Sequence, residues 1–258
     1  MSHKTYSLQN KIIGIVGGVG VYAGNDLANK IFALTNATSD QEHLPLLLAS
    51  FPELIVDRTE FLTGHVQQNP ALGIFEVIRT LERSGAELIG IPCNTAHAPE
   101  IFDVLLQLLS NAGSRVTVVN MLEVLVEEIV KNYPNAQNVG IVSTLGTYRT
   151  NVYPNLLDNV GLTAVIPDEG TQIQLHNAIY DTEYGIKSIA NPVSDKARTI
   201  LQNTVLDLIA HGSHVVVLGC TEVPLALTEK EVHGITLIDP TEILAKKLIS
   251  LAAPQKLK

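Results

Sequence analysis

The segment "GIVGGVGVYAGN" (residues 14–25) recurs in altered form as "GIVSTLGTYRTN" (residues 140–151). Gly, Ile and Val, then Gly, Tyr and Asn, coincide at a constant offset of 126 positions. The two cysteines of the chain, Cys93 and Cys220, lie 127 positions apart, and each follows an apolar run. Because self-similarity at a fixed spacing indicates repeated structural units, we expect two halves of similar fold, each with a cysteine in an equivalent place.

Short apolar runs alternate with segments of helical periodicity along the whole chain. The runs predict strands at residues 11–17, 44–50, 86–92, 115–120, 138–143, 162–167, 214–219 and 234–239. Segments such as 71–85 and 195–212 space their apolar residues near 3.6 and end at glycine, as helices often do. This alternation favours parallel sheets covered by helices. The sequence predicts an α/β fold with two pseudosymmetric lobes, residues 1–120 and 121–258, whose last helix (about 241–258) can pack back on the first lobe.

Composition narrows the classes of function. The net charge is −9 and no more than two basic residues adjoin, which argues against binding nucleic-acid phosphates. No uninterrupted apolar stretch reaches the roughly 18 residues of a membrane helix, and the first residues lack the apolar core of a signal peptide. We therefore expect a cytoplasmic protein without membrane contact, whose two cysteines are free thiols.

Two thiols facing each other across a cleft could act as a base and an acid. Ligands of open α/β sheets bind beyond the carboxyl ends of the strands, where both cysteines are predicted to lie. The residues after Cys93 are typical of a helix start capped by Asn94 or Thr95, and those after Cys220 of a shorter one capped by Thr221. A helix N-terminus lowers a thiol pKa. A thiolate could remove a proton from one face of a carbon while the thiol delivers another to the opposite face, which inverts a stereocentre without a cofactor.

Other interpretations of these residues stay open at this point. A buried cysteine often serves only as a small apolar residue, and a hydrolase could pair Cys93 with His97. Residues 18–23 match G-x-G-x-x-A, as in dinucleotide sites, but no acidic residue closes a following strand, and a glycine turn that admits a small anion is the simpler interpretation. The cysteines and histidines lack zinc-ligand spacing. We expect neither a metal nor a cofactor.

Several strings resemble the aspartate racemase branch of the aspartate/glutamate racemase superfamily. They are "GIVGGVG" (14–20), "PELIVDRTEF" (52–61), "IPCNTAH" (91–97), "GIVSTLGTYRT" (140–150), "YGIKS" (184–188) and "LGCTEVPL" (218–225). The resemblance implies a two-lobed α/β fold with an interlobe site and cofactor-independent racemisation of aspartate by two cysteines. It also implies a homodimer.

The resemblance assigns roles to particular residues. It implies two bases, contacts to the substrate's α-carboxylate and α-amino group, cations for a distal carboxylate, nearby threonines, and an acidic residue where glutamate racemases carry His. Cys93 and Cys220 would be the two bases, and Asn94, Thr95 and Thr221 would contact the α-carboxylate and α-amino group. Arg58 and Lys187 would be the cations for the distal carboxylate, and Thr144 and Thr147 the nearby threonines. Glu222 is the acidic residue at the position of that His.

The first turn departs from the pattern of that branch. Val19 and Val21 stand where Met and Pro are usual. A racemase of broad amino-acid specificity is therefore an alternative, as are a hydantoin racemase, a maleate isomerase, a decarboxylase and a non-catalytic amino-acid-binding module.

Overall fold

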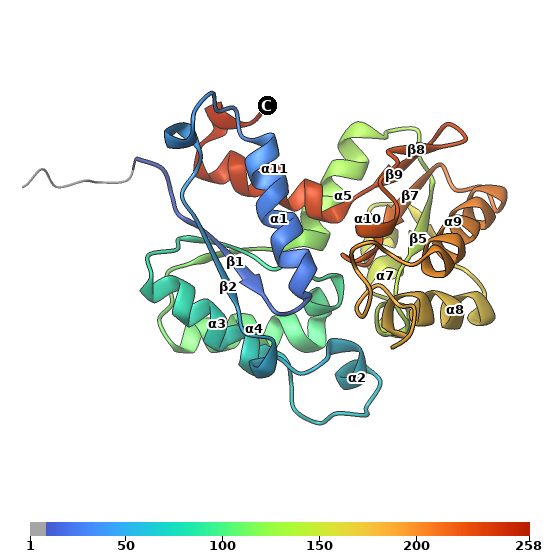
Figure 1. Ribbon diagram of the computed structural model, residues 1–258, viewed down its shortest axis with the longest axis horizontal. Helices are drawn as coiled ribbons and strands as arrows, with labels where there is room; N and C mark the ends of the chain where they lie inside the picture. Colours follow the sequence, from blue (N-terminus) through green and yellow to red (C-terminus); the bar gives the residue numbers. More distant parts are fainter. Residues whose placement is uncertain (1–8) are drawn as a thin grey trace, which may run out of the picture.

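The computed structural model describes residues 9–258 and has two parallel sheets flanked by helices (Figure 1). The first sheet has the order β2-β1-β3-β4, and the second has the order β6-β5-β7-β9-β8. The strands are β1 (Ile13–Gly17), β2 (Leu46–Ser50), β3 (Leu88–Gly90), β4 (Thr117–Val119), β5 (Asn138–Val142), β6 (Thr163–Val165), β7 (Val215–Leu218), β8 (Glu231–Val232) and β9 (Ile235–Ile238). We call each sheet with its helices a lobe. The predicted α/β fold with two lobes is confirmed.

The two sheets share one plan. Strands β1 to β4 of the first lobe correspond in order to β5, β6, β7 and β9 of the second, and all these neighbours are parallel. Even the register agrees, because Gly14 pairs with Ile89 and Gly140 pairs with Val216. Each cysteine then follows four positions after the paired residue of β3 or β7. The repeat in the sequence therefore reflects equivalent positions in the two sheets.

Helices connect the strands and cover the sheets. They are α1 (Val21–Leu34), α2 (Arg58–Leu62), α3 (Ala71–Arg83), α4 (Pro99–Asn111), α5 (Met121–Asn132), α6 (Leu145–Arg149), α7 (Val152–Asp158), α8 (Glu169–Tyr180), α9 (Asp195–Ala210), α10 (Val223–Ala226) and α11 (Pro240–Ala252). As predicted, α3 and α9 are followed by glycines, Gly85 and Gly212, whose φ angles of 99° and 86° allow the chain to leave the helix. In the described part of the chain, no helix is long and apolar enough to cross a bilayer.

Helix α11 follows the last strand of the second sheet but packs on the first lobe. It contacts α1, α5 and β3 (Figure 1). Gly90 of β3 makes this packing possible, since a Cβ there would lie 2.7 Å from Leu248 of α11. The boundary near residue 120 stays a prediction.

Two local predictions were wrong, and one short strand was missed. The segment after Cys93 forms a 3₁₀ turn, Asn94–His97, and α4 begins only at Pro99, because proline holds Ala98 in an extended conformation and favours the first helical position. Cys93 thus lies outside the first turn of α4, where the dipole acts. Glu222, not Thr221, is the N-cap residue of α10. The short antiparallel strand β8 was not predicted, because two residues carry no periodic signal.

We predict that the packing of α11 contributes strongly to stability. Leu248→Ala removes a completely buried side chain, and we expect a loss of about 2–5 kcal/mol of unfolding free energy. Leu251→Ala on the same helix is the control, since Leu251 is 38% exposed; we expect it to cost less than about 1 kcal/mol. Urea denaturation measures both. Equal losses would contradict the described packing.

Candidate active site

Cys93 and Cys220 line the same cavity between the lobes. Both are free thiols, and each follows the carboxyl end of its strand. The structure brings together all ten residues to which the resemblance assigned a role. The cavity is lined by Arg58, Cys93, Asn94, Thr95, Thr144, Thr147, Lys187, Cys220, Thr221 and Glu222, together with Val19, Tyr180 and Gly219. Its volume of about 10 Å³ is about the least that can hold one water molecule, so an amino acid can enter only if the walls move.

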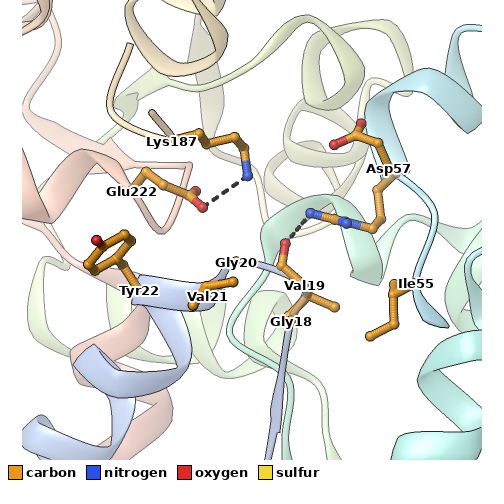
Figure 2. Close-up of a pocket in the computed structure, with 10 residues that line it drawn as sticks. Gly18, Val19, Gly20, Val21, Tyr22, Ile55, Asp57, Lys187 and Glu222 are labelled. Carbon is orange, nitrogen blue, oxygen red and sulfur yellow. Dashed lines mark hydrogen bonds and ion pairs between the residues drawn. The ribbon is translucent and has the colours of Figure 1, made fainter. Parts of the chain in front are cut away.

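A larger pocket adjoins this inner cavity and shares four of its lining residues. Val19, Arg58, Lys187 and Glu222 face both spaces. The outer pocket has a volume of about 400 Å³, which suits a small ligand. The glycine turn, Gly18 to Tyr22, lines it together with Ile55 and Asp57, and Figure 2 shows the ammonium group of Lys187 pointing toward the carboxylate of the neighbouring Glu222. The shared residues separate the outer pocket from the cysteines.

Arg58 supplies a buried positive charge on the side of Cys93. It opens α2 and donates hydrogen bonds to the backbone carbonyls of Val19 and, at 3.4 Å, Val56. Burial opposes the charge of the guanidinium, but its neighbours Cys93 and Asp57 raise the pKa of Arg58 above its ordinary value. The first-lobe cysteine therefore lies beside a permanent cation.

Glu222 supplies a buried negative charge on the side of Cys220. Its carboxylate accepts hydrogen bonds from Lys187 at 3.1 Å, from the thiol of Cys220 at 3.0 Å and from Thr221 at 3.3 Å. Burial alone would raise the pKa of Glu222, but Lys187 and the bond from Cys220 lower it below its ordinary value. Burial raises the pKa of Cys220 well above its ordinary value, and the charge of Glu222 raises it further. Cys220 is therefore a thiol that donates to a carboxylate.

The second of the two glycines common to both copies of the repeat, Gly20 and Gly146, marks where the opposite lobe approaches. A Cβ at Gly20 would lie 2.5 Å from Oε1 of Glu222, and one at Gly146 would lie 2.7 Å from Oγ1 of Thr59. The predicted glycine turn thus makes room for an anion, but this anion is the protein's own Glu222. A second negative group at this turn, such as a pyrophosphate, would be repelled by it.

His97 does not act as a base toward the Cys93 sulfur in this geometry. Its Nδ1 hydrogen-bonds the backbone carbonyl of Cys93 at 2.8 Å, and its ring stacks on Phe102. Burial lowers the pKa of His97 to about 4, so the ring is neutral at pH 7. It orients the loop that carries Cys93, and the alternative of a Cys–His hydrolase loses its support.

Two tyrosines of the second lobe were not found from the sequence. Tyr180 lines the cavity and donates to Asp57 at 3.0 Å, and Tyr153 donates to Asn94 at 2.6 Å. Both bonds join the lobes, and neither tyrosine lies in a motif. Among residues 9–258, no group of three or more His, Cys, Asp or Glu side chains could hold a metal ion.

Comparison with known proteins shows the family to which the chain belongs. The sequence profile of the Asp/Glu/hydantoin racemase family matches residues 16–248. The chain belongs to this family.

Similar proteins cover nearly its whole length. The aspartate racemase of Picrophilus torridus has a similar structure, with a TM-score of 0.79, 28% sequence identity and coverage of 96% of both chains. A structure of an aspartate racemase homologue from Pyrococcus horikoshii OT3 gives a TM-score of 0.70 and 25% identity, covering 94% of this chain and 99% of that one. The broad-specificity amino-acid racemase RacX of Bacillus subtilis (strain 168) is 25% identical over 93% of this chain and 97% of its own length.

We predict that Glu222 suppresses ionisation of Cys220. Glu222→Gln removes the negative charge and leaves the charge of Lys187 unopposed; because both changes favour a thiolate, the pKa of Cys220 falls. Cys220 should then react with iodoacetamide at a lower pH than in the unmodified protein. Mass spectrometry of the Cys220 peptide across a pH series measures this.

The control is Glu169→Gln, at an exposed residue of α8. It should leave the pH profile of Cys220 unchanged. A profile that stays in place in Glu222→Gln, or moves to higher pH, would contradict the arrangement of charges described above.

Proposed function

We propose that this protein is an amino-acid racemase that needs no cofactor and uses two thiols, with aspartate as its substrate. The observation that carries the proposal is that Cys93 and Cys220, at equivalent strand ends of the two lobes, line one cavity. A substrate between them would present one face of its α-carbon to each sulfur. Membership of the Asp/Glu/hydantoin racemase family supports the same reaction class.

The charges around the thiols suggest which one starts as the base. The permanent cation Arg58 lies beside Cys93, whereas the thiol of Cys220 donates its proton in a hydrogen bond to Glu222. In one direction, the Cys93 thiolate takes the α-proton and the C–H electron pair moves into the carboxylate as an enediolate. Cys220 then gives its proton to the opposite face of the carbon. Cys93 ends as a thiol and Cys220 as a thiolate, which is the starting state for the reverse direction.

The remaining cavity residues would bind the substrate. We assign its α-carboxylate and α-amino group to the buried polar side chains beside the cysteines, Asn94, Thr95 and Thr221, with Thr144 and Thr147 nearby. These polar groups and the cations can stabilise the negative charge that develops in the transition state.

Arg58 and Lys187 would bind the distal carboxylate of aspartate. They are the two cations of the cavity wall, and arginine offers planar paired donors to a carboxylate. Lys187 already pairs with Glu222, so an incoming carboxylate would share or replace that contact. Because of this ion pair, and because Val19 and Val21 line the outer pocket, a racemase of broad amino-acid specificity is the second candidate. The similarity to the broad-specificity racemase RacX supports this candidate.

We predict that the protein exchanges the α-proton of L-aspartate with solvent and inverts the configuration of its α-carbon. In D₂O the product should be D-aspartate with deuterium at Cα. Chiral chromatography measures the amount of the D-enantiomer, and NMR measures the deuterium at Cα. Cys93→Ala and Cys220→Ala should each lower racemisation by roughly 10²–10⁴-fold, because each removes an acid–base group. Ser110→Ala, at an exposed position of α4, is the control and should retain full activity.

The same assay separates the alternatives. Inversion of other amino acids but not aspartate would identify a different substrate of the same reaction. Activity on a hydantoin or maleate alone would replace the amino-acid proposal with another reaction. Binding of amino acids without any deuterium exchange would leave a non-catalytic binding module and sink the proposed racemisation.

A further inference from the structure

Tyr153 makes an unusual contact between the lobes. It lies on α7 of the second lobe, is 1% exposed, and donates its hydroxyl to Oδ1 of Asn94 in the first lobe at 2.6 Å. Asn94 is the residue directly after Cys93 and lines the inner cavity. A side chain of one lobe therefore holds a side chain next to the thiol of the other.

The other end of the Asn94 amide has no partner. Its Nδ2 is buried and makes no hydrogen bond within the protein, although this group carries two donor hydrogens. A buried donor without a partner is costly, and such exceptions often belong to a functional site. Because Oδ1 accepts from Tyr153 and Asn94 lines the inner cavity, the NH₂ group is the end of the amide that is left for a ligand.

Tyr153 also contacts the segment of the second cysteine. Gly219, which precedes Cys220, would bring a Cβ to 3.1 Å from Cε2 of Tyr153. The ring thus touches one cysteine loop and hydrogen-bonds the other. Burial raises the pKa of Tyr153 well above its ordinary value, so the hydroxyl keeps its proton and remains a donor to Asn94.

Tyr148, a tyrosine with a purely structural role in the same lobe, has different hydrogen-bond partners. The hydroxyl of Tyr148 donates to the carbonyl of Ile141 and accepts from the amide of Ser143, both at 2.8 Å. These partners are backbone groups of one short segment, and none of them is left unsatisfied. The single partner of Tyr153 is a side chain that lines the inner cavity and whose NH₂ group has no partner.

We propose that Tyr153 is a positioning residue, whose hydroxyl holds the amide of Asn94 so that its NH₂ group donates to the carboxylate of the bound substrate. The inference rests on the proposed racemase function and adds to it a residue outside the cavity wall. As the carboxylate gains charge in the enediolate, the oriented donor stabilises it more than the ground state. Without Tyr153, the amide is free to turn its oxygen toward the carboxylate, which is repulsive.

A double-mutant cycle tests whether Tyr153 acts through Asn94. Tyr153→Phe keeps the ring and removes only the hydroxyl. We expect it to lower kcat/KM by about tenfold in the unmodified background, the loss typical of one hydrogen bond to a charged group. In the Asn94→Ala background the same change should have less than about a twofold effect, since the amide to be oriented is gone. Equal effects in both backgrounds, or no effect in either, would overturn the proposal.

A measurement without substrate keeps this test separate from the proposed function. In ¹⁵N NMR spectra, the side-chain NH₂ signals of Asn94, identified by their absence in Asn94→Ala, should shift in Tyr153→Phe. Unshifted signals would overturn the orienting role even in an active enzyme. If instead the signals shift while the unmodified protein inverts no amino acid, the proposed function fails and the orienting contact stands.

Folding of the variants is checked by thermal melting. If Tyr153→Phe does not fold, the NMR signal of the Tyr153 hydroxyl proton provides the test instead. This signal should be observable because a buried proton in a 2.6 Å hydrogen bond should be protected from exchange with water. That resonance should be present in the unmodified protein and absent or strongly shifted in Asn94→Ala. An unchanged resonance would show that the hydroxyl does not depend on Asn94.

Discussion

The parallel pairing of two central strands in each lobe is the constraint on which the site depends. β3 pairs with β1 and β7 pairs with β5 in equivalent registers, so the segments that leave β3 and β7 emerge at the same relative place in each sheet. A slip of one residue would turn every side chain to the other face of its sheet. Both cysteines reach one cavity because this register is kept twice.

The two lobes have similar folds, but the charges beside their cysteines differ in sign. Cys93 has the guanidinium of Arg58 nearby, while Cys220 donates to the carboxylate of Glu222. Lys187 keeps this carboxylate ionised despite its burial. A duplicated fold therefore carries two chemically different halves of a site, as the proposed proton transfer between the two faces of a carbon requires. Gly20 and Gly146 are alike for a simpler reason, since each admits a residue of the opposite lobe.

Much of this could be predicted from the sequence, and the limits have physical causes. The eight apolar runs became strands because a run of apolar residues is a strong local signal, which comes from burial on both faces in β1, β3, β5 and β7, whereas the two-residue β8 leaves none. The cavity residues were found because they lie in short motifs, some of them at strand ends, that resemble those of a known family. Tyr153 and Tyr180 were missed because their roles come from contacts across the lobes, 59 and 123 positions away in the chain. The pairing of Lys187 with Glu222 was hidden for the same reason, and it changes what the lysine offers to a ligand.

The position of α11 has a consequence for biosynthesis. The helix comes after the last strand of the second lobe, yet it covers Gly90 of β3 and lies against α1. During synthesis, the first lobe therefore lacks the cover of α11 until the second lobe has been made. The first lobe cannot complete its packing before that, and its uncovered apolar face is exposed to aggregation in the meantime.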